Sequence, residues 1–358
     1  MRHTAVDPGL DALRHHGDAE LVAGGVDFAV NVRGAGPPGW LRDRLAARVA
    51  DLGGYPTVDD AEAATAAVAA RHGVAPDRVL QLAGASEGFH LLADHAARRG
   101  LRAAVVHPSF TEPEVELRRA GVPVDRVLLE PPFRLDPAVV PGAAGLVVVG
   151  NPTNPTSVLH PRGDVAALCR PGRVTVVDEA FCDVVDDEGA HSLAGAELPG
   201  LVVLRSLTKT WALAGLRVGY AVGDPGVLAD LAAHRPHWPL GTLQLEAIRA
   251  CAGAEADAAL AGIRAGVAAE REAMVRRLGD AGVEVAVPPA APFVLVRTPR
   301  GLDPAAFREG LAARGISARR CDTFPGLDAT YLRLAVRAGT MVDDLLAAWR
   351  AETEGTQR

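Results

Sequence analysis

Lys209 is the only lysine in this chain, and every other basic residue among its 37 lysines and arginines is an arginine. A solvated surface charge or a salt bridge can use either side chain, so these roles do not explain why a lysine stands at this position. A primary amine that loses its proton and attacks a carbonyl does explain it. The guanidinium of arginine stays protonated above about pH 12, whereas burial and neighbouring charges can tune a lysine. On composition alone, nucleophilic chemistry and the chance survival of one codon both stay open.

Hydroxyl and cationic side chains surround Lys209 in the sequence. Ser206 and Thr208 precede it, and Arg217 follows it, on a loop that leaves an apolar strand. Two hydroxyls and a guanidinium can converge on one phosphate. Upstream, Gly84-Ala85-Ser86 opens a predicted helix, where small residues let backbone N–H groups approach an anion. The sequence therefore predicts an anion-binding site near Lys209.

A carboxylate and an amide end two other apolar runs. Asp178 follows the run 174–177, and Asn154 lies just after the run 146–149, where two prolines hold it in a rigid turn. Polar residues just past the carboxyl ends of parallel strands are where α/β sheets bind ligands. We therefore expect Asp178 and Asn154 to face the same ligand as Lys209.

The elements that must position these residues alternate β-branched runs with Ala/Leu-rich helical stretches. The runs are nearly continuous apolar segments, which is typical of strands buried on both faces of a mostly parallel sheet. We therefore predict an α/β fold with helices on both faces of the sheet. The predicted strands are 102–106, 146–149, 174–177, 201–204 and 218–222, and the predicted helices include 85–98, 112–120 and 161–169.

After about Trp238 the pattern changes to a smaller α+β unit, which begins with a long Ala/Arg/Glu-rich helix over 255–281. Its other predicted elements are strands at 283–287, 293–296, 316–319 and 331–336, and helices at 303–314 and from Thr340 onwards. We predict three regions. They are residues 1–50, an N-terminal arm and part of the small domain; 51–240, the large domain; and 241–358, the small C-terminal domain.

Length and composition exclude several classes of protein. The 358 residues, 49% of them hydrophobic and 23% charged, describe an ordinary soluble protein of one large or two medium domains. A net charge of -7 without a basic run argues against a nucleic-acid binder. No apolar stretch approaches the length of a membrane span. The four cysteines lack CxxC or zinc-ligand spacing, so we expect free thiols, no metal site and a cytoplasmic location.

Taken in order, these segments resemble the class I/II aminotransferases, which are fold type I pyridoxal-phosphate (PLP) enzymes. The resemblance covers most of the chain and implies that residues 51–240 form the PLP-binding domain. It implies that Lys209 is the Schiff-base lysine and that Asp178 keeps the ring nitrogen protonated, which makes the ring an electron sink. Asn154 would hydrogen-bond the 3-oxygen of the ring, and Phe110 would stack on its face. The residues implied to hold the cofactor phosphate are Gly84, Ala85, Ser86, Ser206, Thr208 and Arg217.

Further expectations follow from the same resemblance. Tyr55 matches a tyrosine that in such enzymes reaches the phosphate from the other subunit, which implies a homodimer. Arg333 matches the arginine that binds the substrate carboxylate through a bidentate fork. Phe181 stands where a tyrosine is common, so one hydrogen bond to the cofactor is missing. Ser157 replaces a usual glycine, which we interpret as a backbone adaptation.

Each of these residues also has a simpler interpretation. Asp178 alone could be a buried salt-bridge partner, and Arg217 a surface charge. Phe110 could belong to the core, and Arg333 could point to solvent. Because the residues occur together and in order, the combination favours the cofactor site.

Two subgroups of the family fit, and both act on phosphorylated amines. The histidinol-phosphate aminotransferases share the motif order and an arginine at the position of Arg319. The threonine-phosphate decarboxylases of cobalamin synthesis are more similar in segments 16–18, 26–31, 108–112 and 319–326, although residues 31–34 lack the Asn-x-Asn-Pro turn usual in both. The residues that we expect to bind the substrate are Asn31, Arg319, Arg320, Arg333 and Arg337. We predict an aminotransferase, because that reaction dominates the superfamily, with the decarboxylase as a close alternative.

An alternative from another class is a non-catalytic PLP-binding regulator. Such regulators usually carry an added DNA-binding helical module, for which we see no room before Asp27. The presence of Lys209, Asp178 and Arg217 also favours an enzyme. A Rossmann-type dinucleotide enzyme is disfavoured because no G-x-G-x-x-G follows the first strand.

Overall fold

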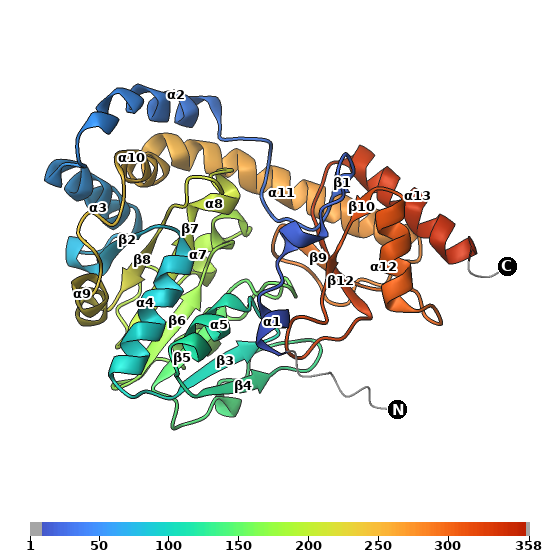
Figure 1. Ribbon diagram of the computed structural model, residues 1–358, viewed down its shortest axis with the longest axis horizontal. Coiled ribbons are helices and arrows are strands. Elements are labelled where there is room, and N and C mark those ends of the chain that lie inside the picture. The colour runs from blue at the N-terminus through green and yellow to red at the C-terminus, as the bar shows by residue number, and fades with distance from the viewer. Residues whose placement is uncertain (1–8, 356–358) are drawn as a thin grey trace.

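Seven strands form the central sheet of the computed structural model, which describes residues 9–355 (Figure 1). From edge to edge they are β2 (Val79–Leu82), β8 (Gly219–Gly223), β7 (Leu201–Ser206), β6 (Val174–Asp178), β5 (Leu146–Gly150), β3 (Ala103–His107) and β4 (Val124–Leu128). The strands from β4 to β7 are parallel, and β8 is antiparallel to both β7 and β2. The predicted mostly parallel sheet is confirmed.

Successive side chains of each strand enter two separate apolar layers. In β5, Val147 and Val149 pack into the layer that contains residues of α2, α3 and α10, whereas Leu146 and Val148 pack into the layer that contains residues of α4, α5 and α9. Burial on both faces explains why the strands are continuous apolar runs. The helices are α2 (Gly39–Ala47), α3 (Val58–His72), α4 (Ala85–Arg98), α5 (Glu112–Arg119), α9 (Pro225–Ala233) and α10 (Thr242–Cys251).

A three-stranded antiparallel sheet lies in the C-terminal part of the chain, in the order β11 (Arg319–Arg320), β12 (Tyr331–Ala335) and β9 (Phe293–Arg297). It shares an apolar cluster with α12 (Pro304–Ala313), α13 (Gly339–Gly355) and the end of α11 (Ala254–Asp280). The N-terminal segment joins this unit, because β1 (Val26–Asp27) pairs with β10 (Ile316–Ser317). The division into 1–50, 51–240 and 241–358 stays a prediction, and its residues 1–8 and 356–358 lie outside the described part.

Several local predictions are wrong in detail. Residues 283–287 form no strand beyond an isolated bridge between Val285 and Val296, and the two prolines that follow this segment cannot donate to a ladder. The predicted strand 316–319 is divided, because β10 pairs with β1 and β11 pairs with β12. The helix predicted over 161–169 is the shorter α6 (Arg162–Ala166).

The remaining elements are short. They are α1 (Leu10–Leu13), α7 (Glu188–His191), α8 (Leu207–Thr210) and the 3₁₀ helices η1 (Gly17–Glu20), η2 (Val49–Gly53), η3 (Pro76–Arg78), η4 (Pro137–Val139) and η5 (Cys182–Val184). Within residues 9–355, none of the helices combines the length and the apolar character that crossing a bilayer requires.

Candidate active site

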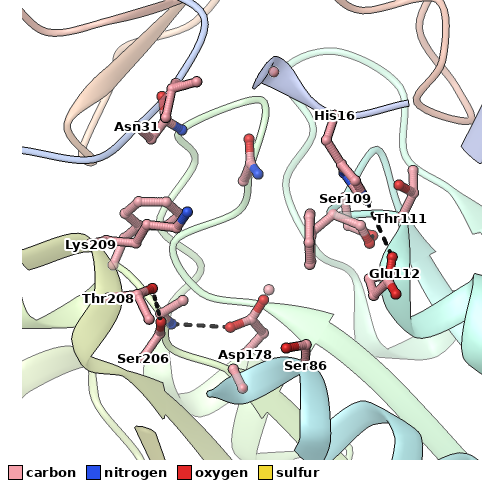
Figure 2. A pocket seen from close by; sticks show the side chains of 18 of the residues that line it. His16, Asn31, Ser86, Ser109, Thr111, Glu112, Asp178, Ser206, Thr208 and Lys209 are labelled. Atoms are coloured by element: carbon pink, nitrogen blue, oxygen red, sulfur yellow. Dashed lines mark hydrogen bonds and ion pairs between the residues drawn. The ribbon is translucent and has the colours of Figure 1, made fainter. Parts of the chain in front are cut away.

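The carboxyl ends of the central strands face a cavity of about 540 Å³, which is also lined by the N-terminal segment and the C-terminal unit (Figure 2). This volume is in the range of small-molecule sites. The predicted site residues that line it are Asn31, Ala85, Ser86, Phe110, Asn154, Asp178, Ser206, Thr208, Lys209, Arg217, Arg319 and Arg333. Gly84 is the residue before the lining residue Ala85 in the sequence but does not line the cavity itself. Tyr55 and Arg337 also lie outside the cavity lining.

Lys209 lies in the short helix α8, directly after strand β7, and not on the loop that the sequence predicted. Burial lowers the pKa of its amine from 10.5 to about 8, and the positive charges of Arg333 and Arg217 act in the same direction. The carboxylates of Asp178 and Asp18 oppose this change. At pH 7 about a tenth of such an amine is neutral, so Lys209 is far more nucleophilic than an exposed lysine.

Asp178 is the last residue of β6, where the backbone pairs with Leu204 of β7. Burial raises the pKa of its carboxyl from 3.8 to about 6, and the neighbouring charge of Glu179 adds to the effect. The backbone N–H of Ala180 donates to it at 3.1 Å. No cationic side chain within residues 9–355 forms an ion pair with Asp178 at 4.0 Å or less. The site thus holds a buried carboxylate that suits a cationic ligand.

An anion cradle forms around the N-terminus of α4. Gly84 has a φ of +85°, and a Cβ there would lie 3.2 Å from Nη2 of Arg217. The same nitrogen donates to Ser86 Oγ at 2.9 Å, and the hydroxyls of Ser206 and Thr208 lie 2.7 Å apart. In the described part of the chain, no carboxylate lies within ion-pair distance of Arg217. Helix amides, hydroxyls and an unneutralised guanidinium together suit a phosphate.

The opposite wall of the cavity contains Arg333 and Asn31. Nη1 of Arg333 donates to Asn154 Oδ1 at 2.7 Å, and Nη2 donates to the carbonyl of Ala29. Burial lowers the pKa of Arg333. Asn31 is 7% exposed, and in the part of the chain that the structure describes neither its side-chain oxygen nor its nitrogen has a hydrogen-bond partner. A buried amide left without partners is costly, so these atoms suit a ligand that enters the cavity.

The other predicted arginines differ in what they do. Arg319 lines the cavity, is 2% exposed, and donates to the carbonyl of His15 at 2.6 Å and to Thr323 Oγ1 at 2.8 Å. Arg337 lies outside the cavity and donates to the carbonyls of Asp27, at 2.7 Å, and Val30. Arg337 thereby supports the loop that carries Asn31.

Two more predicted residues also lie away from the cavity lining. Arg320 is paired with Asp322. Tyr55 is 73% exposed and stacks on Trp238, with 4.2 Å between the ring centroids. The side chain of Tyr55 is therefore largely exposed at the surface of the chain.

The cavity also contains polar residues to which the sequence analysis assigned no role: His16, Asp18, Ser109, Thr111 and Glu112. Nε2 of His16 lies 3.4 Å from a carboxylate oxygen of Glu112. This contact joins the N-terminal segment to the start of α5 across the cavity. The similarity of segments 16–18 and 108–112 to the decarboxylases was the available signal, but it did not indicate which side chains face inward.

Phe181 and Ser157, the two residues that depart from the family pattern, have surroundings that explain how each residue fits the site. Phe181 lines the cavity and packs edge-on against Phe293, with 5.0 Å between the ring centroids. Its side chain has no hydrogen-bonding group to offer a ligand. Ser157 has a φ of +64°, the left-handed region that favours glycine, and its Oγ accepts from the backbone N–H of Ala291 at 2.8 Å. The interpretation of Ser157 as a backbone adaptation is confirmed.

Comparisons with known proteins agree with this geometry. The profile of the family "Aminotransferase class I and II" matches residues 37–350. A histidinol-phosphate aminotransferase of Mycobacterium tuberculosis is 55% identical over 328 residues, which are 92% of this chain and 88% of that protein. A threonine-phosphate decarboxylase of Sinorhizobium sp is 33% identical over 308 residues, which are 83% of this chain and 84% of that protein.

A solved structure gives the same fold. The histidinol-phosphate aminotransferase from Clostridium acetobutylicum superposes with a TM-score of 0.83 at 22% identity, covering 92% of this chain and 99% of that one. At 22% identity this superposition shows the fold alone. The family is shown by the family profile and by the sequence relatives. The chain belongs to the class I and II aminotransferases, a family of PLP-dependent enzymes.

Proposed function

We propose that this enzyme transfers an amino group from a small phosphorylated amine, with histidinol phosphate as the first candidate. The observation that carries the proposal is one cavity with three unmatched groups. These are the largely buried amine of Lys209, the unpaired carboxylate of Asp178 and the unneutralised guanidinium of Arg217. The relative that is 55% identical is named as a histidinol-phosphate aminotransferase, which supports this choice.

The residues of the cavity fit PLP. The phosphate would be held by the α4 amides with Ser86, Ser206, Thr208 and Arg217, in a cradle that a Cβ at Gly84 would crowd. Asp178 would pair with the ring nitrogen, Asn154 would hydrogen-bond the ring oxygen, and Phe110 would cover the ring. When bound, the cofactor supplies an electron sink for the charge left at the substrate carbon.

Side chains of the protein would bind and orient the substrate, and Lys209 would carry the proton that leaves and returns to the substrate. Because the pKa of Lys209 is about 8, its amine can accept and return a proton near neutral pH. Arg333 and Arg319 offer guanidinium groups to the phosphate or carboxylate of the substrate. Asn31 can donate and accept hydrogen bonds with the substrate, because its side-chain amide has no partner among residues 9–355.

A threonine-phosphate decarboxylase is the second candidate. The observations in its favour are the relative of that name at 33% identity and the similarity of segments 16–18, 26–31, 108–112 and 319–326. The same arginines would then bind both the phosphate and the carboxylate of the substrate. A PLP-binding regulator without catalysis has no comparable observation in its favour.

One paired assay tests the two reactions. The purified protein with PLP is incubated with histidinol phosphate and 2-oxoglutarate, and separately with phosphothreonine alone. We expect glutamate from the first mixture, in an amount that depends on 2-oxoglutarate. Lys209→Ala is the control and should lose both the visible cofactor band and the activity. Release of CO2 from phosphothreonine without a keto acid, and no glutamate from the first mixture, would replace the proposal by the decarboxylase.

We also propose a homodimer in which Tyr55 reaches the active site of the partner subunit. Exposed apolar residues are close to this tyrosine in sequence or stack on it: Val49, Leu52, Val58 and its stacking partner Trp238 are each at least half exposed. Exposed apolar clusters of this kind are typical of interfaces. Sedimentation of the protein at micromolar concentration should give twice the mass of one chain, and Trp238→Glu should reduce that mass. A wild-type monomer that retains full activity would contradict the proposal.

We place the enzyme in the cytoplasm. Its four cysteines are free thiols, and three of them are buried, which suits a reducing compartment. Fractionation of cells that express the full chain checks this, and recovery of the protein outside the cytoplasmic fraction would contradict it.

A further inference from the structure

A completely buried acid–base pair lies beneath the loop that connects β3 to α5. Nε2 of His107 is 2.8 Å from a carboxylate oxygen of Glu114, and both side chains are 0% exposed. Arg118 and Arg126 donate to the same carboxylate at 2.6 and 2.8 Å. A buried ionic network is not stabilising by default, because apolar residues of similar size often do as well. The reaction described above uses none of these four residues, so their placement needs another reason.

The pair is connected to the cavity through Ser109. The Oγ of Ser109 lies 3.2 Å from Nδ1 of His107, and Ser109 lines the cavity beside Phe110. The carboxylate of Glu114 only accepts hydrogen bonds, so Nε2 of His107 carries a hydrogen. The Oγ of Ser109 thus continues a hydrogen-bonded chain from Glu114 through the imidazole of His107, and the same Oγ lies 3.5 Å from the carbonyl oxygen of Phe110. This hydroxyl is therefore in contact with a pair of side chains that have no contact with solvent.

The ring of Phe110 is partly buried and packs at the margin of the apolar layer that contains residues of α4. That ring meets Phe89 and His16 only in tilted arrangements, with 6.2 and 5.7 Å between the ring centroids. The hydroxyl of Thr111 donates to the carbonyl of Leu13, which holds the end of the loop and not its centre. Ser109, next to Phe110, is the residue that ties the centre of the loop to the sheet.

We propose that Glu114, His107 and Ser109 form a positioning relay that fixes the ring of Phe110 over the cofactor. The relay rests on the proposed function, because it assumes that Phe110 covers the ring of PLP. Glu114 orients the imidazole, the imidazole fixes the hydroxyl, and the hydroxyl fixes the backbone on which Phe110 stands. These are positioning residues and not catalytic ones.

The test uses the PLP-loaded protein and the circular dichroism of the visible cofactor band, which reports how the ring is held. Ser109→Ala should weaken this band and raise the dissociation constant of PLP by about 2- to 12-fold, the range for loss of one hydrogen bond. Ser109→Thr keeps the hydroxyl and should restore both values. Glu114→Gln should change the band in the same direction as Ser109→Ala.

Ser317→Ala is the matched control. Ser317 is also a buried serine, 1% exposed, whose Oγ accepts from the backbone N–H of Val22 at 2.9 Å, and it does not line the cavity. This variant should lower the thermal midpoint without changing the cofactor band. Nitrogen NMR of His107 in the cofactor-free protein adds a readout that needs no PLP. The Nδ1 resonance of His107 should move in Ser109→Ala, because this variant removes the hydroxyl that contacts Nδ1.

The possible failures are distinguishable. If Ser109→Ala leaves the cofactor band, the dissociation constant and the His107 resonance unchanged, the relay is refuted and the proposed function stands. If Ser317→Ala changes the band as much as Ser109→Ala does, the effect is one of general stability, and the relay is also refuted. If the wild type itself does not bind PLP, the proposed function fails, and the relay fails with it.

Discussion

Lys209→Met should stabilise the cofactor-free protein at neutral pH. The wild-type amine has a pKa of about 8 in the folded protein and 10.5 when it is exposed in the unfolded chain. Holding the protonated amine in its largely buried site therefore costs up to about 3 kcal/mol. Methionine has a similar length and no charge, so the cost disappears. For a chain of this size, 3 kcal/mol corresponds to about 4 °C in the thermal midpoint.

The stability advantage of Lys209→Met should depend on pH in a direction that follows from the lowered pKa of Lys209. Between about pH 8 and 10.5 the unfolded wild-type chain holds a proton on Lys209 that the folded protein has lost. Wild-type stability therefore rises with pH through this window. The advantage of Lys209→Met should be complete below pH 8 and should vanish by about pH 10.5. Thermal unfolding of both cofactor-free proteins at pH 7, 8.5 and 10.5, followed by circular dichroism, measures it.

Asp178→Asn is a control with the opposite dependence on pH. The pKa of Asp178 is raised from 3.8 to about 6, so the folded protein holds the extra proton between these values. Wild-type stability therefore falls as the pH rises from about 4 to 6, and the advantage of Asp178→Asn should be present above pH 6 and lost below about pH 4. If Lys209→Met has no advantage at pH 7, or one that stays constant up to pH 10.5, the burial argument for Lys209 is wrong.

Three other variants test the remaining walls of the cavity. Arg217→Ala removes a charged partner of the cofactor phosphate and should weaken PLP binding by about 10- to 100-fold in a fluorescence titration, whereas Arg300→Ala, whose side chain is 92% exposed, should not. Asn31→Leu removes an unsatisfied buried amide and should raise the thermal midpoint of the cofactor-free protein while raising the substrate KM at least about tenfold; a fall in both would contradict this. In Arg333→Lys, a single ammonium group cannot keep the contacts to Asn154 and Ala29 and also bind an anion in a bidentate manner. We expect kcat/KM to fall about 100-fold, and near-native kinetics would exclude a role of Arg333 in binding the substrate anion.

Local sequence was sufficient for the central sheet but not for its edges. The strands β3, β5, β6, β7 and β8 are apolar runs that are buried on both faces, so the pattern found each of them within one or two residues. The edge strands β2 and β4 were not predicted. Three of the four residues of β2 and three of the five residues of β4 are only partly buried, and β4 contains Asp125 and Arg126. Neither segment is therefore a continuous apolar run in the sequence.

In the candidate site too, the sequence was sufficient for some residues and not for others. Residue type and order predicted Lys209, Asp178 and Arg217, because the strand that precedes each loop is visible in the sequence and parallel strands end at one edge. The sequence did not separate Arg319, which lines the cavity, from Arg337, which supports the loop behind it. Both are arginines close to apolar strands, and only the pairing of β11 with β12 and of β1 with β10 decides which one faces inward.

The sequence by itself determined the kind of chemistry: one lysine among 37 lysines and arginines, just after an apolar run that forms a buried strand. That conclusion needs only residue identity and neighbours along the chain. Tertiary structure decided how the lysine behaves and what surrounds it. The pKa of about 8, the partnerless amide of Asn31 and the buried His107–Glu114 pair all depend on desolvation by residues distant in sequence. Desolvation depends on which surfaces meet in the folded protein, and the order of residues does not state that.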